Sequence, residues 1–124
     1  MSTSLKILVV DDFATMRRIM KNILKQLGYT NITEADDGTT ALEELKRGSF
    51  DLIISDWNMP KMTGLDLLKV VRSDPDYKDI PFLMVTAEAQ KQNVIEAVQA
   101  GVSNYVVKPF TAEAIADKLG KIIG

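Results

Sequence analysis

The sequence predicts a doubly wound α/β fold, a three-layer sandwich in which a five-stranded parallel sheet lies between two layers of helices. Two observations lead to this prediction. Short runs of β-branched or aliphatic residues alternate five times with amphipathic segments along the 124 residues. Most of these runs are continuously apolar, which is typical of parallel strands that are covered on both faces. A chain of this length usually forms one domain, so we expect a single domain over residues 1–124.

Four of the five predicted strands are strongly marked by continuous aliphatic residues. They are residues 6–10, 51–55, 81–85 and 104–107. The remaining run, residues 31–35, has fewer aliphatic residues, and we therefore expect it nearer an edge of the sheet.

The segments between the strands have the apolar spacing of amphipathic helices, with a cap or a breaker at an end of each. The breakers after the first four are Gly28, Gly48, the pair Asp74-Pro75 and Gly101, and Thr111 is expected to cap the fifth. The buried sides are expected to carry Met16, Ile19, Met20, Ile23, Leu24 and Leu27; then Ala41, Leu42 and Leu45; then Leu65, Leu68 and Val71; then Val94, Ile95 and Val98; and finally Ala112, Ile115, Leu119 and Ile122.

Basic residues near the start of the first helix (Arg17, Arg18 and Lys21) are expected on its solvated side, with kinase docking as the alternative role.

The composition excludes several kinds of chemistry. The chain has no Cys and no His, so it can form no disulfide, thiolate metal site, imidazole base or Ser-His-Asp triad. The chain has a formal net charge of −2, whereas nucleic-acid-binding domains usually have an excess of basic residues, so we do not expect it to bind DNA or RNA. The first apolar run, residues 7–10, is far too short for a signal peptide or a membrane span. We therefore expect a soluble, cytoplasmic monomer that binds neither nucleic acid nor membrane.

Polar residues follow the four strongly marked strands at their C-terminal ends. They are Asp11 and Asp12 after the first strand, Asp56 after the third, Thr86 after the fourth and Lys108 after the fifth. The C-terminal ends of parallel strands lie along one edge of the sheet, where ligands of open α/β sheets bind. Any one of these residues could simply begin a loop, but the five together indicate a functional site.

Three neighbouring carboxylates favour a bound cation. Two carboxylates about 5 Å apart repel by roughly 3 kcal/mol at an effective dielectric constant near 20, and Lys108 can neutralise only one of them. Two or three carboxylates with water suit Mg²⁺ better than Ca²⁺. Such a site also suits a phosphoryl group, to which the Thr86 hydroxyl would donate a hydrogen bond. Asp56 is best placed as the nucleophile, whereas the adjacent Asp11 and Asp12 are better suited as metal ligands.

Four motifs, taken in this order and spacing, resemble the receiver domains of two-component response regulators, most closely the stand-alone chemotaxis regulators. They are DDFATMRR at residues 11–18, DWNMP at 56–60, TAEA at 86–89 and KPF at 108–110. The resemblance covers essentially the full length. It implies a single receiver domain without an output domain, and the flavodoxin-like strand order 2-1-3-4-5.

The resemblance also implies roles for the residues of the site. Asp56 would accept a phosphoryl group from a phosphohistidine on a chemotaxis-type sensor histidine kinase. Mg²⁺ would be held by Asp12 and Asp56 directly, by Asp11 largely through water and by the backbone carbonyl of Asn58. Lys108, Thr86 and Ala87 would bind the phosphoryl oxygens, and the Lys108–Pro109 bond would be cis. Asn58 and Glu88 would modulate the rate of dephosphorylation.

The output implied by the resemblance is a switched surface. Thr86 and Tyr105 would be the switch pair, although Tyr105 could equally be a half-buried strand aromatic. The partner face would include Lys91, Val94 and Tyr105. Its partner would be the flagellar motor switch protein, and a phosphatase could also act on the chain. Gln90 stands where a Lys is frequent in the family, and it alters a face that contacts partners.

Three other functions compete with this interpretation. A hydrolase of the haloacid-dehalogenase type also uses an Asp nucleophile with Mg²⁺, Thr and Lys, but it would need an acid where the chain has Asn58. We therefore expect no enzyme beyond self-phosphorylation and slow autodephosphorylation. In a flavodoxin-like electron carrier, Asp11 and Asp12 would repel the flavin phosphate. The nearest alternative is a single-domain receiver that serves as a phosphorelay intermediate or a phosphate sink.

Overall fold

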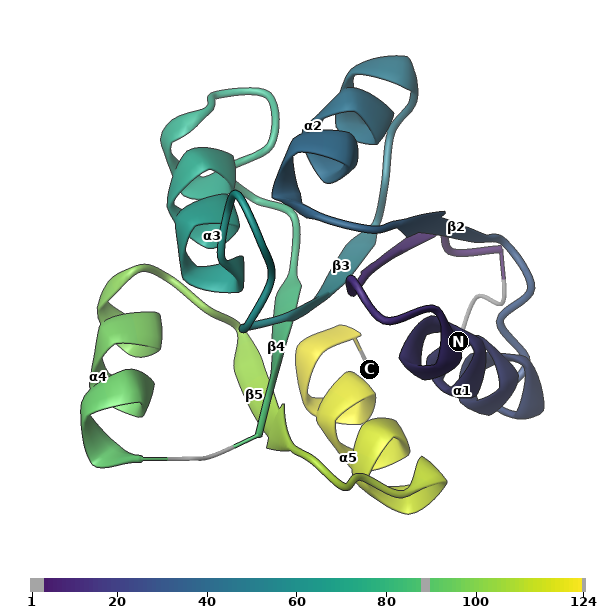
Figure 1. The fold of residues 1–124 in the computed structure, drawn as a ribbon. Helices are drawn as coiled ribbons and strands as arrows, with labels where there is room; N and C mark the ends of the chain where they lie inside the picture. The colour runs from purple at the N-terminus through teal and green to yellow at the C-terminus, as the bar shows by residue number, and fades with distance from the viewer. Residues whose placement is uncertain (1–3, 88–89, 124) are drawn as a thin grey trace.

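One parallel sheet runs through the middle of the molecule (Figure 1), and the computed structural model describes residues 4–87 and 90–123. Its strands are β1 (Ile7–Val10), β2 (Ile32–Ala35), β3 (Leu52–Asp56), β4 (Phe82–Thr86) and β5 (Asn104–Val107). All neighbouring strands are parallel and their order is β2-β1-β3-β4-β5. The predicted fold class and strand order are therefore confirmed.

Helices cover both faces of this sheet. They are α1 (Ala14–Gln26), α2 (Gly38–Arg47), α3 (Gly64–Ser73), α4 (Lys91–Gln99) and α5 (Ala112–Ile123). Figure 1 shows α1 and α5 on one face and α2, α3 and α4 on the other. Successive residues of a strand point to opposite faces. Ile7 and Val9 accordingly pack in the core with α1 and α5, whereas Leu8 and Val10 pack in the second core with α2 and α3.

The helix ends follow the predicted signals. Gly28 and Gly101 have φ values of 96° and 95°, a conformation that few other residues adopt readily. The Thr111 hydroxyl accepts a hydrogen bond from the amide of Ala114 at 3.1 Å and so caps α5. Within the ranges 4–87 and 90–123, none of the helices combines the length and the apolar character that crossing a bilayer requires.

Some of the predicted buried positions are wrong. Ile19 in α1 is 41% exposed, so its side chain lies outside the apolar stripe that packs on the sheet. In α4, Ile95 and Val98 are 39% and 60% exposed, and Ala97 is instead the buried residue of that helix. A helical apolar pattern shows that one face is apolar but not what covers that face.

The covering of β5 also differs from the prediction. This strand was expected to be covered on both faces, but only Val106 of its four residues is buried. The reason is its position, because β5 lies at the edge of the sheet opposite β2. The continuous apolar run therefore belongs here to an edge strand that leaves Val107 36% exposed.

Candidate functional site

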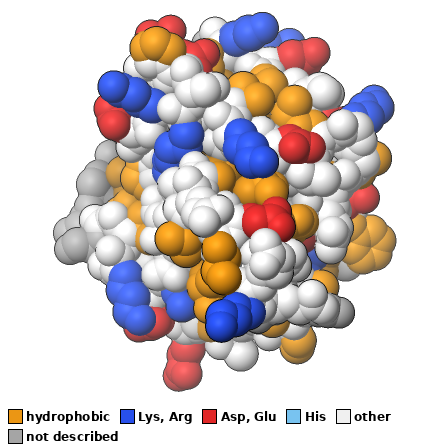
Figure 2. Space-filling model, turned by 90° about the vertical axis from the view of Figure 1, so that its left-hand side faces the viewer, with side chains coloured by type: hydrophobic (Ala, Val, Ile, Leu, Met, Phe, Trp, Pro, Cys, Tyr) orange, Lys and Arg blue, Asp and Glu red, His pale blue; other side chains and the backbone are white. Residues whose placement is uncertain are grey.

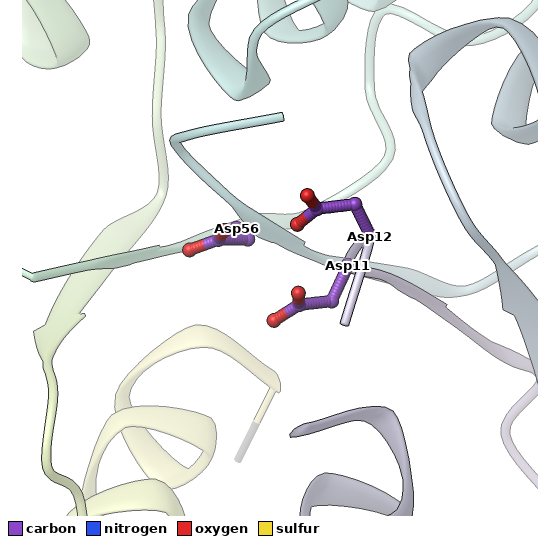
Figure 3. A group of neighbouring side chains, drawn as sticks. All are labelled: Asp11, Asp12 and Asp56. Carbon is purple, nitrogen blue, oxygen red and sulfur yellow. The ribbon is translucent and has the colours of Figure 1, made fainter. Parts of the chain in front are cut away.

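Three carboxylates meet at the C-terminal edge of the sheet. β1 and β3 are neighbours, and their register pairs Val10 with Ser55. Asp11 and Asp56, the next residue on each side, therefore lie side by side, and Asp12 follows in the loop. One carboxylate oxygen from each of the three lies within 4.8 Å of the other two (Figure 3).

Lys108 brings a positive charge to the same place. Its ammonium lies 3.1 Å from Oδ1 of Asp56 and 3.5 Å from Oδ2 of Asp11. The residue directly follows β5, and its amide donates to the Thr86 carbonyl at 2.8 Å, which continues the pairing between β4 and β5. Its bond to Pro109 is cis, in agreement with the family resemblance.

The other predicted site residues lie around this cluster. Thr86 is buried as the last residue of β4, one position beyond the residue that pairs with Asp56. Asn58 and Ala87 are exposed in the loops that follow β3 and β4. Glu88 lies outside the described residues.

The predicted switch and partner residues lie on α4 and β5. Lys91 is exposed as the first residue of α4, and Val94 is half-buried one turn later. Tyr105 of β5 is half-buried against the core that contains α2 and α3, and the Lys118 ammonium of α5 lies 5.5 Å from the centre of its ring. The position of Tyr105 is compatible both with a switch residue and with an ordinary strand aromatic.

Burial dominates the electrostatics of the acidic cluster. It raises the pKa of Asp56, and the neighbouring Asp11 carboxylate adds to that rise, whereas Lys108 opposes it. Burial likewise raises the pKa of Asp11, against the lowering effects of the Phe13 amide and of Lys108. Holding these groups ionised therefore costs free energy that one ammonium only partly offsets.

This donor set fits a hard divalent cation. The carboxylates of Asp11, Asp12 and Asp56 offer oxygen atoms within one small space, and their negative charge exceeds the positive charge of Lys108. Mg²⁺ prefers such oxygen ligands and keeps several of its waters, which suits a site with one exposed carboxylate, that of Asp12.

The start of α3 packs against the end of β3, next to the acidic cluster. The sequence interpretation missed this contact. The Gly64 amide donates to the carbonyl of Trp57 at 2.8 Å. A Cβ at position 64 would collide with the backbone oxygen of Asp56 and would lie 2.8 Å from the sulfur of Met84. Only a glycine therefore allows α3 to approach the end of β3 this closely.

The expected solvation of the first helix is wrong for one of its basic residues. The Arg17 side chain is 18% exposed, and its Nη1 donates to the carbonyl of Asp11 at 2.7 Å. Its Nε donates to Glu34 of β2 at 3.1 Å. The available signal in the sequence was a pair of cations at the start of a helix, where the helix dipole disfavours positive charge.

Comparison with known proteins agrees with this geometry. Residues 7–120 match the family model described as the response regulator receiver domain. Among curated relatives, chemotaxis protein CheY of Pseudomonas aeruginosa is 62% identical over 118 residues, which cover 95% of each chain. Chemotaxis protein CheY-3 of Vibrio cholerae is 57% identical over 122 residues, which cover 98% of this chain and 94% of the relative.

Solved structures share the fold over nearly the whole chain. The structure of chemotaxis protein CheY4 of Vibrio cholerae, crystallised at pH 4.0, has a TM-score of 0.90 at 37% identity and covers 97% of this chain and 99% of its own. The receiver domain of a sensor histidine kinase from Pseudomonas aeruginosa has a TM-score of 0.87 at 27% identity and covers 98% of each chain. That structure has a magnesium ion coordinated in its active-site cleft.

Proposed function

Because the chain belongs to the response regulator receiver domain family and is of the CheY chemotaxis type, we propose that Asp56 accepts a phosphoryl group from a phosphohistidine on a chemotaxis-type histidine kinase. The observation that carries this proposal is the meeting of three carboxylates and one ammonium at one edge of the sheet. Membership of this family implies a histidine kinase upstream and a target downstream.

The transfer is a substitution at phosphorus. A carboxylate oxygen of Asp56 forms the new P–O bond while the P–N bond to the kinase imidazole breaks, and the electron pair of that bond stays on the imidazole. Lys108, whose ammonium lies 3.1 Å from Asp56, opposes the rise in the pKa of Asp56 and then donates hydrogen bonds to the phosphoryl oxygens. The Thr86 hydroxyl and the Ala87 amide, at the end of β4, supply further donors to these oxygens.

The acidic residues would hold Mg²⁺. Asp12 and Asp56 would bind it directly, Asp11 largely through water, and Asn58 through its backbone carbonyl. When bound, Mg²⁺ offsets the negative charge on the phosphoryl oxygens. Asp11, Asp12 and Asp56 lie close enough together to bring their oxygens to one ion.

We do not expect turnover of phosphate esters. Asn58, two residues after the phosphoacceptor, can neither donate nor accept a proton as a carboxylic acid would. The chain would therefore catalyse only its own phosphorylation and a slow autodephosphorylation, with Asn58 and Glu88 modulating the rate of the latter. Steady phosphate release from a monoester at several turnovers per second would contradict this.

The proposed output is a change in the face formed by α4, β5 and α5. Phosphorylation would draw the Thr86 hydroxyl toward the phosphoryl group and let the Tyr105 ring pack inward, which shifts the population between two packings. Hydrophobic side chains gather among lysine and arginine side chains on the side of the molecule that carries α4 (Figure 2). Ile95, Val98 and Val107 are exposed near the predicted partner residues Lys91, Val94 and Tyr105, which supports a docking surface there.

The partner we propose for this face is the flagellar motor switch protein, and the location is the cytoplasm. A single-domain relay or a phosphate sink would use the same chemistry without that partner. Capture of motor switch protein, with and without acetyl phosphate, separates these outcomes. Capture that increases on phosphorylation supports motor binding, and equal capture favours the relay or sink.

Labelling by acetyl phosphate tests the chemistry. The parent chain should incorporate phosphoryl groups with Mg²⁺ and lose this ability in EDTA, and Asp56→Asn should not be labelled. Asp117→Asn is the matched control, because Asp117 is an exposed aspartate in an ion pair with Lys121 at 3.3 Å on the surface of α5. Labelling of Asp56→Asn at the parent rate would show that Asp56 is the wrong acceptor.

A further inference from the structure

Arg17 connects three elements beside the acidic cluster. It lies in the first turns of α1, and its Nη1 donates to the backbone carbonyl of Asp11 at 2.7 Å, where β1 ends. Its Nε donates to Oε1 of Glu34 on β2 at 3.1 Å. The other oxygen of Glu34 accepts from the Lys21 ammonium at 3.2 Å, so that this carboxylate is itself held by two cations. One guanidinium thus bridges β1 and β2 from α1.

The carbonyl that Arg17 binds belongs to the peptide group between Asp11 and Asp12. The rest of Asp11 is already fixed, because its amide donates to the carbonyl of Ala35 at 3.1 Å and its Oδ1 accepts from the Phe13 amide at 2.9 Å. The orientation of the peptide group between Asp11 and Asp12 sets the direction in which the Asp12 side chain leaves the backbone. Arg17 therefore acts on the position of Asp12, the exposed carboxylate of the cluster.

Helix stability does not account for a cation at this position. The dipole of α1 disfavours positive charge in its first turns, the first turn carries no acidic residue, and Phe13 provides no side-chain cap. Local rules are broken in proteins mostly where function requires it. Arg17 is also partly desolvated, with its side chain 18% exposed, which adds to the cost of keeping it there.

We propose that Arg17 is a positioning residue for the metal site: by bridging Glu34 and the Asp11 carbonyl, it fixes the peptide group that aims Asp12 at the cation. This inference rests on the proposed function, since it assumes that the acidic cluster binds Mg²⁺. Mg²⁺ tolerates little departure from octahedral geometry, so a misdirected Asp12 should weaken binding. The planar guanidinium suits this task because its donors can hold two separate acceptors at once.

The sign of the effect distinguishes positioning from electrostatics. Arg17 brings a positive charge close to a cation site, so removing that charge alone would strengthen Mg²⁺ binding. If positioning dominates, Arg17→Gln should instead weaken Mg²⁺ binding, by about tenfold, as is typical when an outer partner of a metal ligand is removed. Arg18→Gln is the matched control, since it removes the same charge from the next, exposed position of α1.

The experiment measures Mg²⁺ affinity in the unphosphorylated full chain. Calorimetric titration gives the Kd, and the fluorescence of Trp57, the one tryptophan of the chain and the neighbour of Asp56, provides a second readout. We expect Arg17→Gln to raise the Kd for Mg²⁺ about tenfold and Arg18→Gln to leave it unchanged or lower it. The rate of labelling by acetyl phosphate should fall in Arg17→Gln at limiting Mg²⁺ and return to the parent rate at saturating Mg²⁺.

Each outcome decides one question. If the parent binds no Mg²⁺, the proposed function fails and the inference falls with it. If the parent binds Mg²⁺ and Arg17→Gln binds it as tightly as Arg18→Gln does, the proposed function stands and the positioning role is wrong. Should Arg17→Gln fail to fold by circular dichroism, Arg17→Lys decides: its ammonium keeps the charge but lacks the fixed planar spacing of the Nε and Nη1 donors that fits the two acceptors. A Kd raised several-fold then supports positioning, and an unchanged Kd overturns it.

Discussion

Replacing Asp56 by Asn should make the metal-free protein more stable at neutral pH, although the substitution removes the proposed phosphoacceptor. The substitution keeps the shape of the side chain and an oxygen that can accept from Lys108, whose ammonium lies 3.1 Å away. It removes a buried negative charge from a cluster in which Asp11 and Asp12 each present an oxygen within 4.8 Å.

The magnitude follows from the distances. At an effective dielectric constant near 20, one carboxylate within 4.8 Å repels Asp56 by at least about 3 kcal/mol, and the Lys108 ammonium at 3.1 Å attracts it by about 5 kcal/mol. Asp12 adds a smaller repulsion because water screens its exposed carboxylate. These terms nearly cancel, so the cost of burying the Asp56 charge decides the sign. We expect Asp56→Asn to raise the free energy of unfolding by about 1 kcal/mol, the lower end of the penalty for desolvating one buried polar group.

The pH dependence has a definite direction. Because the folded-state pKa of Asp56 is raised, the folded state favours the neutral form of this side chain. The stability that the parent gains from this preference is fully present below pH 3.8, the ordinary pKa, and is lost as the pH rises through the folded-state pKa. The advantage of Asp56→Asn should therefore be absent in strong acid, grow as the pH rises above 3.8 and reach a plateau above the folded pKa.

Urea unfolding in EDTA, followed by circular dichroism across this pH range, measures the difference. Added Mg²⁺ should then reverse the order, because a ligand at 100 times its Kd stabilises the parent by about 2.7 kcal/mol and a variant lacking one metal ligand gains less. A lower stability of Asp56→Asn than of the parent in EDTA at pH 7 would show that burial does not dominate the electrostatics of this cluster.

Other substitutions test the support of the site, the ammonium and the docking surface. Gly64→Ala should lower the free energy of unfolding by about 1–3 kcal/mol, because its Cβ would collide with the backbone of Asp56. Gly120→Ala should raise it by about 0.5–1 kcal/mol, because an added Cβ at this position of α5 meets no other atom within 4 Å. Chemical denaturation measures both. Lys108→Arg should still be labelled by acetyl phosphate but bind the motor switch protein less tightly when labelled, since a planar guanidinium replaces a compact ammonium; unchanged affinity would contradict the role of Lys108. Val98→Ser, at a side chain 60% exposed, should change stability by less than about 0.5 kcal/mol yet reduce capture of the motor switch protein, and undiminished capture would place the docking surface elsewhere.

Much of the fold could be predicted because continuous aliphatic residues in the sequence indicate which strands are buried on both faces. The runs that became β1, β3 and β4 are buried throughout, and buried parallel strands have few alternatives to continuous aliphatic residues. The meeting of Asp11, Asp56 and Lys108 was predictable for a geometric reason, since parallel strands place their C-terminal ends on one edge.

The missed features depend on contacts between distant segments. The apolar residues of α4 are spaced as in a packed helix, yet Ile95 and Val98 are exposed. The spacing could not predict this, because it does not specify which segment covers the apolar face. The bridge from Arg17 to Glu34 joins residues on α1 and β2, and the need for Gly64 arises only when α3 approaches the end of β3. Such requirements come from the assembled fold and leave little local trace.

The proposed function requires that one edge of the sheet hold Mg²⁺ and a transferred phosphoryl group together. The most direct measurement is to locate the phosphoryl group by mass spectrometry of peptides after incubation with acetyl phosphate, in Mg²⁺ and in EDTA. We expect modification of the peptide that contains Asp56 when Mg²⁺ is present and none in EDTA. Modification at a different residue, or equal modification of Asp56 in EDTA, would contradict it.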